Sequence, residues 1–387
     1  MIIKIKKIIG FFLGILFKLL PLNKKRIVFI NFNGNGYGDN PKYIAEELAN
    51  RRERLELIWL VREKNKYKFP TYIKPVNMKS IKRYYYLSTA KVIVNNARSY
   101  LGIDKRTGQI YLQTWHAPFT PKYIEKDAEN KLFPQYVKEA KHDGAITDAI
   151  LANSLLQVKQ YKRTFWLNKN AEILTYGLPR NDYLVNNADN WELKDGLRAK
   201  LGIRKDSYVV LYAPTFRDDG SIEGYQMDFD QIKMCFENKF KKDCIILIKL
   251  HPNIQYQNLD IQYDNKIKNV SLYPDSQELA VVSDCLISDY STFLFDFMLL
   301  DRPAFIFAID LEQYKKTRGL LDEFFSFPFP FAKSNDELLN NINEFDIDSY
   351  HMNIKKYVLS NPFYDTGDAS SRVADWIIEK IQRMPSI

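Results

Sequence analysis

The chain alternates short apolar runs with segments of helical spacing, and most apolar runs end in a polar or glycine-containing turn. The apolar runs that predict strands are residues 26–31, 55–61, 91–95, 110–115, 144–153, 171–176, 208–212, 244–250, 285–287 and 304–308. Helical patterns occur between them, for example at residues 79–90 and 277–283. Because strands that alternate with helices form parallel sheets with helices on both faces, the pattern predicts an α/β fold.

The polar stretch at residues 186–196 follows a full complement of strands, and we interpret it as a loop at a domain boundary. A chain of 387 residues is too long for one ordinary core, which also favours two α/β domains. We therefore expect a first domain at residues 26–187 and a second at residues 188–387. The last predicted helix, residues 373–381, could pack back across this boundary.

Residues 1–25 form a separate basic and apolar segment. Their apolar runs at residues 8–17 and 19–22 are interrupted by Lys18 and followed by a basic cluster at residues 24–26. A helix that crosses a bilayer needs about 20 apolar residues, so we expect a helix that lies in the membrane interface, attracted by the anionic inner leaflet. A core helix of the first domain is the alternative. A signal peptide is disfavoured because no small-residue cleavage site follows.

Charge and composition bear on the partners rather than on the fold. The 56 Lys and Arg against 47 Asp and Glu give a net charge of +9, which suits nucleic acid, an anionic membrane surface or a phosphorylated substrate. The basic residues are dispersed and no nucleic-acid-binding motif is present, so we expect no nucleic-acid partner. The 3 cysteines and 4 histidines lack metal-ligand spacing. We expect free thiols, a reducing cytosol and no metal site.

A glycine-rich loop follows the first predicted strand. Gly34, Gly36 and Gly38 alternate with other residues, and Asn40 can cap a helix that begins at Pro41. Alternate glycines between a strand and a helix let the backbone approach a ligand closely, although this spacing is not the dinucleotide fingerprint G-x-G-x-x-G. Gly36 and Gly38 are therefore candidates for the acceptor side of a site, and a tight turn without a ligand is the alternative.

His116 follows a predicted strand, directly after Trp115, and precedes a proline-bounded loop at residues 117–121. An imidazole at a strand end can take a proton from a hydroxyl group near neutral pH, since its unperturbed pKa is about 6.5. A satisfied structural histidine is the alternative. Trp115, directly before His116, is a further candidate for the acceptor side. Arg180, on the turn at residues 177–182, is a candidate phosphate or acceptor contact, with a solvated surface charge as its alternative.

Three successive predicted strands of the second half end in polar or ionisable side chains. These are Thr215 with Arg217, then His251, then Ser288 with Asp289, Ser291 and Thr292. Adjacent parallel strands bring their carboxyl ends along one crevice, and a helix that starts near Ser291 would direct its N–H groups at an anion. Ordinary helix caps are the alternative reading of the hydroxyl-rich turn. Because three strand ends agree, we expect a phosphate-containing ligand.

Seven motifs occur together in the chain. They are WHA at residues 115–117, GLPRND at 177–182, LYAPTFRDD at 211–219, KLHP at 249–252, SDYST with FDFMLLDRP at 288–303, YKKTRG at 314–319, and DTGDASSR at 365–372. In this order they resemble the CDP-glycerol glycerophosphotransferase family, the teichoic-acid and capsule enzymes of bacteria. The resemblance covers about residues 27–375, and seven coordinated motifs are far more specific than any one of them.

The resemblance implies a GT-B fold, in which two Rossmann-like domains face each other across a cleft, without a required cofactor or structural metal. It assigns His116 as the general base and His251 as a phosphate-side residue. The donor pyrophosphate is expected at Thr215, Ser288, Asp289, Ser291 and Thr292, with Arg217, Arg318 and Arg372 as charge partners. Ala117 departs from the family, where many members have glycine after the histidine. Since this loop should face the acceptor, the departure leaves the acceptor's identity open.

The expected function is that of a transferase. It would move glycerol phosphate, or a related polyol phosphate, from CDP-glycerol (or CDP-ribitol) to a hydroxyl of a lipid-linked teichoic acid or capsule acceptor, and release CMP. The expected location is peripheral, on the cytoplasmic face of the bacterial membrane. A nucleotide-sugar glycosyltransferase of the same fold is the alternative, and a nucleic-acid-binding protein or a scaffold without catalysis would come from other classes. Two histidines at strand ends argue against the scaffold.

Overall fold

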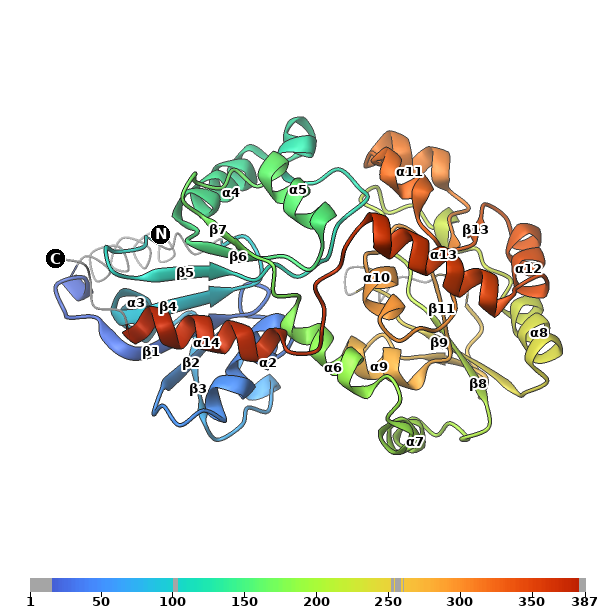
Figure 1. The fold of residues 1–387 in the computed structure, drawn as a ribbon, viewed down its shortest axis with the longest axis horizontal. Helices are drawn as coiled ribbons and strands as arrows, with labels where there is room; N and C mark the ends of the chain where they lie inside the picture. The colour runs from blue at the N-terminus through green and yellow to red at the C-terminus, as the bar shows by residue number, and fades with distance from the viewer. Residues whose placement is uncertain (1–15, 100–103, 252–253, 255–258, 260, 383–387) are drawn as a thin grey trace. The chain divides into compact units, whose positions relative to one another are not determined.

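The computed structural model of the protein, drawn as a ribbon in Figure 1, describes residues 16–99, 104–251, 254, 259 and 261–382. The chain divides into two compact units. The first unit consists of Met1–His116, Glu129–Asp182 and Tyr364–Ile387, and the second of Ala117–Ala128 and Tyr183–Phe363. This division differs from the single boundary expected near residue 187 in two segments. Residues 117–128 belong to the second unit, and the segment that begins at residue 364 belongs to the first.

The first unit is built on a 7-stranded parallel sheet, in the order β3-β2-β1-β4-β5-β6-β7. Its strands are β1 (Asn23–Ile30), β2 (Glu56–Val61), β3 (Ile73–Asn77), β4 (Ala90–Asn95), β5 (Ile110–Gln113), β6 (Ala149–Leu151) and β7 (Glu172–Leu174). The central strands are buried almost throughout, because helices cover both faces of the sheet.

The described helices of the first unit include α2 (Asp39–Ala49), α3 (Lys82–Thr89), α4 (Pro134–Ile146), α5 (Leu155–Thr164) and α14 (Ala369–Gln382). Figure 1 shows α14, the last helix of the chain, lying beside α2 on one face of this sheet. Val373, Ala374, Trp376 and Ile377 of α14 join the same buried cluster as Ile44 and Leu48 of α2. The expectation that the last helix packs back onto the first half is confirmed.

The second unit is built on a 6-stranded parallel sheet, in the order β10-β9-β8-β11-β12-β13. Its strands are β8 (Tyr208–Tyr212), β9 (Cys244–Ile248), β10 (Ile267–Asn269), β11 (Cys285–Ser288), β12 (Ala304–Phe307) and β13 (Phe331–Ala332). Its helices include α7 (Trp191–Lys200), α8 (Phe229–Phe240), α9 (Ser276–Val282), α10 (Phe293–Met298), α11 (Leu311–Thr317), α12 (Asn335–Asn343) and α13 (Ile347–Ser360). The two parallel sheets with helices on both faces confirm the predicted α/β class.

The prediction of a loop at residues 186–196 is wrong. α6 (Asp182–Asn187) and α7 (Trp191–Lys200) occupy most of this stretch. Asn190 caps α7, since its side-chain oxygen accepts a hydrogen bond from the Leu193 N–H at 3.0 Å. Lys194 and Leu197 bury one face of the helix. Polar composition hides such a helix, because only a narrow stripe of it needs to be apolar.

The expected membrane-interface helix at residues 1–25 falls mostly outside the described residues. Within the part of the chain that the structure describes, no helix combines the length and the hydropathy needed to cross a bilayer.

Candidate active site

His116 lies in the first unit, just beyond the carboxyl end of β5. The preceding residue, Trp115, has a φ of 51°, a left-handed conformation that is unusual for a bulky side chain. Its indole is buried and packs edge-on against Phe165, with 4.8 Å between ring centroids. This packing holds the turn that brings His116 to the strand end. Trp115, predicted on the acceptor side, therefore forms part of the buried wall behind the histidine.

The imidazole of His116 has a defined orientation. Its Nδ1 lies 2.8 Å from the backbone carbonyl oxygen of Asn96, which follows β4. A carbonyl oxygen can only accept, so Nδ1 must donate the hydrogen bond. In the neutral ring, Nε2 then carries the lone pair. This is the tautomer that a general base requires, and Asn96 is a residue that the sequence analysis did not identify.

Arg180 and Asn40 hold the backbone on which His116 is carried. Nη1 of Arg180 donates to the carbonyl oxygen of His116 at 2.6 Å and to Oδ2 of Asp39 at 3.2 Å. Nδ2 of Asn40 donates to the carbonyl oxygen of Trp115 at 2.9 Å, and its Oδ1 accepts from the Arg180 N–H at 3.1 Å. Both side chains are buried. The predicted Arg180 is thus close to His116, and it acts on the histidine through the backbone.

A buried ion pair stabilises the same strand end through contacts with residues of β5. Nη1 of Arg98 lies 2.9 Å from Oδ2 of Asp143, and both side chains are about 1% exposed. Asp143 also accepts hydrogen bonds from the Tyr111 hydroxyl at 2.6 Å and from Gln113 at 3.2 Å. These residues lie far apart in the sequence and carry no motif, so sequence reasoning missed them.

The glycines of the loop before α2 have different roles. Gly34 has a φ of +87°, and a Cβ there would lie 1.9 Å from the sulfur of Met78, so the close approach requires glycine. Gly36 also has a positive φ, and its carbonyl oxygen accepts a hydrogen bond from the Trp59 indole at 3.0 Å. A Cβ at Gly38 would meet no atom of the described residues within 4 Å. The tight turn explains Gly34 and Gly36, and Gly38 borders open space.

The GLPRND and DTGDASSR motifs contact each other within the first unit. Asp182 accepts hydrogen bonds from the N–H groups of Ala369 at 2.9 Å and Ser370 at 2.7 Å, and so caps α14. Asp365 accepts from the Leu178 N–H at 2.8 Å. The guanidinium of Arg372 lies 4.4 Å from the centre of the Tyr176 ring, in the first unit. Arg372, predicted as a charge partner of the donor phosphates, therefore belongs to a different unit from the other predicted donor residues.

In the second unit, β9, β8 and β11 are neighbours, as the three polar strand ends predict. Thr215 follows β8, and its backbone N–H donates to Oδ1 of Asp289, which follows β11, at 2.8 Å. The hydroxyl Oγ1 of Thr215 is buried and has no hydrogen-bond partner among the residues that the structure describes. A buried hydroxyl without a partner costs about 1–3 kcal/mol. Such an atom is therefore a candidate contact for a bound ligand.

Arg217 is the ionic centre of the second unit. Its Nη1 donates to Oδ2 of Asp289 at 2.8 Å and to the carbonyl oxygen of Thr215, while Nε and Nη2 donate to Asp310 at 2.5 and 3.0 Å. Burial of the guanidinium opposes its charge, but the two carboxylates outweigh that effect and raise its pKa. These contacts occupy Arg217, so the geometry gives it a positioning role for Thr215 and Asp289.

The predicted hydroxyl groups separate into buried and accessible ones. Ser288 is fully buried, and its Oγ donates to the carbonyl oxygen of Ala213 at 2.6 Å, which joins β11 to β8. Ser291 and Thr292 are half-buried and lie at the turn before α10. Oγ of Ser291 accepts from the Phe293 N–H at 3.2 Å. Of the predicted hydroxyls, Ser291 and Thr292 are the accessible pair, and Ser288 stabilises the sheet.

His251 and Arg318 complete the predicted residues of the second unit. His251 follows β9 and packs its ring against Phe216, with 4.5 Å between ring centroids. Arg318 directly follows α11, and its Nη1 forms an ion pair with Oδ2 of Asp218 at 2.8 Å. Asp218 and Asp219 are both exposed, and in the described residues no group of three or more His, Cys, Asp or Glu is placed to hold a metal ion.

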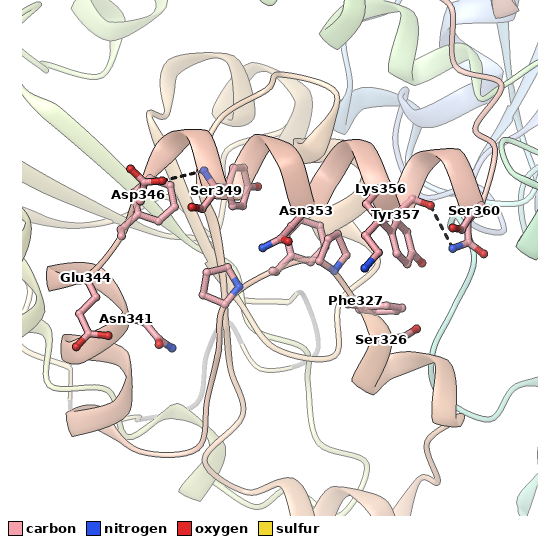
Figure 2. A pocket seen from close by; sticks show the side chains of 16 residues that line it. Ser326, Phe327, Asn341, Glu344, Asp346, Ser349, Asn353, Lys356, Tyr357 and Ser360 are labelled. Carbon is pink, nitrogen blue, oxygen red and sulfur yellow. Dashed lines mark hydrogen bonds between the residues drawn. The ribbon is translucent and has the colours of Figure 1, made fainter.

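A groove of about 730 Å³ lies elsewhere in the second unit (Figure 2). Figure 2 shows it between α13, the end of α12 and the segment at residues 326–330, with polar side chains such as Asn341, Asn353 and Lys356 on its walls. Its lining residues include none of the predicted donor residues. One wall of the groove is the segment that leads into β13. The candidate site, in contrast, lies in the loops that follow the carboxyl ends of β8, β9 and β11.

Comparison with known proteins places the chain among transferases. The sequence matches a family model described as CDP-Glycerol:Poly(glycerophosphate) glycerophosphotransferase over residues 13–379. It is 32% identical over 377 residues to a teichoic acid poly(glycerol phosphate) polymerase of Staphylococcus epidermidis, covering 92% of this chain and 51% of that protein. It is 31% identical over 390 residues to a teichoic acid glycerol-phosphate transferase of Staphylococcus aureus, covering 97% and 99%. The chain thus spans about half of the first relative and nearly all of the second.

Among solved structures, the wall teichoic acid polymerase TagF matches with a TM-score of 0.82 and 30% sequence identity, over 96% of this chain and 93% of that chain. A histidine-to-asparagine variant of TagF soaked with CDPG matches with a TM-score of 0.81 at 29% identity, with the same coverage. The similarity and the two parallel sheets confirm the predicted GT-B type of fold, with two Rossmann-like domains.

Proposed function

Because the chain belongs to the CDP-glycerol:poly(glycerophosphate) glycerophosphotransferase family, we propose that it transfers a polyol phosphate from a CDP-linked donor to a hydroxyl group. CDP-glycerol is the proposed donor and CMP the leaving group. The proposed acceptor is a lipid-linked teichoic acid or capsule chain on the cytoplasmic face of the membrane. The protein would act there peripherally, through the segment at residues 1–25.

The observation that carries this proposal is the hydrogen bond from Nδ1 of His116 to the Asn96 carbonyl oxygen, at 2.8 Å. It sets Nε2 as the basic nitrogen of a histidine at a strand end. In the proposed reaction, the acceptor oxygen forms a bond to the phosphorus that bears glycerol, and its proton passes to Nε2 of His116. The bond from this phosphorus to the CMP oxygen breaks, and CMP leaves with the electron pair.

The donor phosphates are proposed to lie at the polar strand ends of the second unit. The unpartnered Thr215 hydroxyl and the accessible hydroxyls of Ser291 and Thr292 can donate to phosphate oxygens. Arg318 and His251 supply positive or hydrogen-bonding groups beside them. Charge on the transferred phosphoryl group and on the departing CMP needs such donors, since phosphoryl transfer depends on positioning and electrostatic stabilisation.

Thr215→Val separates a ligand contact from a structural role. Valine has nearly the same shape, and it removes a buried hydroxyl that has no partner, so the free protein should be as stable as the wild type or slightly more stable. Donor affinity should nevertheless fall by roughly 10- to 100-fold, the value of a hydrogen bond to a charged group. Thr71→Val, at an exposed position of the first unit, is the matched control.

The experiment is calorimetric titration of the wild type and both variants with CDP-glycerol, CDP-ribitol and a UDP-hexose. We expect the wild type to bind a CDP-polyol, Thr215→Val to lose most of this affinity without loss of thermal stability, and Thr71→Val to match the wild type. Binding of the UDP-hexose in preference to both CDP-polyols would refute the proposed donor and favour a glycosyltransferase.

A further inference from the structure

The segment Ala117–Ala128 follows His116 directly but packs into the second unit. It pairs with the loop after α11: the Tyr123 N–H donates to the Gly319 carbonyl at 3.1 Å, and the Leu321 N–H donates to the Pro121 carbonyl at 2.7 Å. These bonds make Lys122 and Leu320 an antiparallel bridge pair. Gly319 has a φ of +85°, and a Cβ there would lie 2.6 Å from the Tyr123 ring. The segment is therefore fixed against the loop by backbone bonds and close packing.

This pairing places Lys122 beside the charged residues of the candidate donor site. Its charge interacts with Arg318, Asp289, Asp218 and Arg217, which come from the loop after α11, the turn after β11 and the loop after β8. The two carboxylates already have partners, because Asp289 pairs with Arg217 and Asp218 pairs with Arg318. Within the described residues, no carboxylate or other acceptor bonds to the Lys122 ammonium, although the side chain is half-buried.

A half-buried ammonium without a partner is unfavourable in the free protein. Burial and the neighbouring Arg318 lower the pKa of Lys122 to about 8. Lysine can also cover apolar surface with its carbon stem and keep the charged end in water, which is the structural explanation of such a residue. That explanation concerns Lys122 alone. It does not explain why the buried Thr215 hydroxyl also lacks a hydrogen-bond partner among the described residues. Thr215 is bound to Asp289, one of the groups that interact with Lys122.

We propose that Lys122, with the Thr215 hydroxyl and Arg318, binds a phosphoryl group of the donor diphosphate. The inference rests on the proposed function and names a residue for the donor site that neither the motifs nor the predicted strand ends include. An anionic phosphoryl group would supply the partner that both the ammonium and the hydroxyl lack. Arg318 is already paired with Asp218, so the unpaired Lys122 is the stronger of the two cationic contacts.

The position of Lys122 in the chain adds a consequence. It lies in the segment that begins immediately after the proposed base, His116. A donor contact from this segment would let bound donor stabilise the loop that follows the base. Removal of the contact should then raise the KM for the donor and also lower kcat, whereas loss of a simple donor contact mainly raises KM.

Proton uptake on donor binding distinguishes a phosphate contact from a lysine with only a structural role. An anion next to Lys122 raises the pKa of its ammonium above the value of the free protein. The contribution of Lys122 to affinity is therefore complete below pH 8 and is lost as pH rises through the raised pKa of the complex. Near pH 8 to 9, binding of CDP-glycerol should take up a fraction of a proton. The diester phosphates of this ligand do not titrate there.

The test compares the full-length wild type with Lys122→Gln, Lys122→Arg and the control Lys126→Gln, an exposed lysine of the same segment. CDP-glycerol is titrated calorimetrically at pH 7, 8 and 9 in buffers of different ionisation enthalpy, and thermal unfolding is recorded for each variant. We expect Lys122→Gln to bind about 10- to 100-fold more weakly at pH 7 and to lose the proton uptake. Lys122→Arg should keep most of the affinity without proton uptake near pH 8, because arginine does not titrate there. Lys126→Gln should match the wild type.

Affinity of Lys122→Gln within about twofold of the wild type, with unchanged proton uptake, would overturn the inference and leave the proposed function standing. If Lys122→Gln does not fold, loss of affinity in the charge-preserving Lys122→Arg at pH 7 would overturn it instead. A wild type that does not bind CDP-glycerol would refute the proposed donor. In that case, titration with inorganic pyrophosphate tests the anion site by itself. Equal binding to the wild type and to Lys122→Gln, or no binding to either, would overturn the inference.

Discussion

The side chain of Arg180 donates a hydrogen bond to the backbone carbonyl oxygen of His116 at 2.6 Å, across 64 positions of sequence. The same nitrogen contacts Asp39, so the arginine joins the turn before α6, the start of α2 and the strand end that carries the histidine. Two motifs that are separate in the sequence thus act on one point of the backbone. We therefore predict that Arg180 is a positioning residue, which would act on the reaction through His116.

Arg180→Met should lower kcat by roughly 10- to 100-fold, because the loss of this anchor lets the imidazole shift from its working position. Donor affinity should stay within about twofold of the wild type, since the proposed donor site belongs to the second unit. Arg54→Met, at an exposed position of the first unit, is the control. Steady-state kinetics and CDP-glycerol titration check both values. A fall in donor affinity with unchanged kcat would contradict the positioning role.

Arg217→Met should destabilise the second unit by about 3–5 kcal/mol, because it leaves the carboxylates of Asp289 and Asp310 buried without their partner. Urea unfolding followed by fluorescence measures the change. Arg204→Met removes an arginine whose ion pair with Asp206 lies on the surface, and it should leave the unfolding midpoint nearly unchanged. Similar midpoints for the two variants would show that Arg217 does not hold the site together.

Gly224→Ala and Gly196→Ala should shift stability in opposite directions. A Cβ at Gly224 would lie 2.3 Å from Nη2 of Arg217, so alanine displaces the guanidinium and should cost about 1–3 kcal/mol. A Cβ at Gly196, inside α7, meets no atom within 4 Å in the part of the chain that the structure describes, and alanine there should stabilise the helix by about 0.5–1 kcal/mol. Thermal unfolding of the pair checks both signs. A neutral Gly224→Ala would mean that the Arg217 ion pairs can rearrange.

The buried strands could be predicted from the sequence because helices cover both faces of each sheet. A strand buried on both faces is a continuous apolar run, and the run at residues 208–212 corresponds to β8 (Tyr208–Tyr212). The edge strand β3 (Ile73–Asn77) was missed because it contains Pro75, which is tolerated at a sheet edge. α4 (Pro134–Ile146) was also missed, and its last residues were assigned to the next strand.

Only those residues of the candidate site that have a local sequence signal could be predicted. The strand ends identify His116 and Thr215, since the residues after a buried strand lie at the edge of the sheet. Their supporting contacts come from distant positions: Asp310, the main partner of Arg217, is 93 residues away, and no local pattern connects them. Sequence reasoning therefore interpreted Arg217 as a phosphate contact, whereas its bonds in the structure are to carboxylates. Lys122 did have a local signal, because it directly follows the proline-bounded loop at residues 117–121.

The central claim, that His116 is the general base of a polyol-phosphate transfer, is tested most directly by single-turnover release of CMP from CDP-glycerol in the presence of a lipid-linked glycerol-phosphate acceptor. His116→Ala should slow the chemical step by about 100- to 10,000-fold while it binds CDP-glycerol within about twofold of the wild type. His142→Ala, which removes an exposed histidine of α4, should release CMP at the wild-type rate. CMP release by His116→Ala at a rate near that of the wild type would contradict the account.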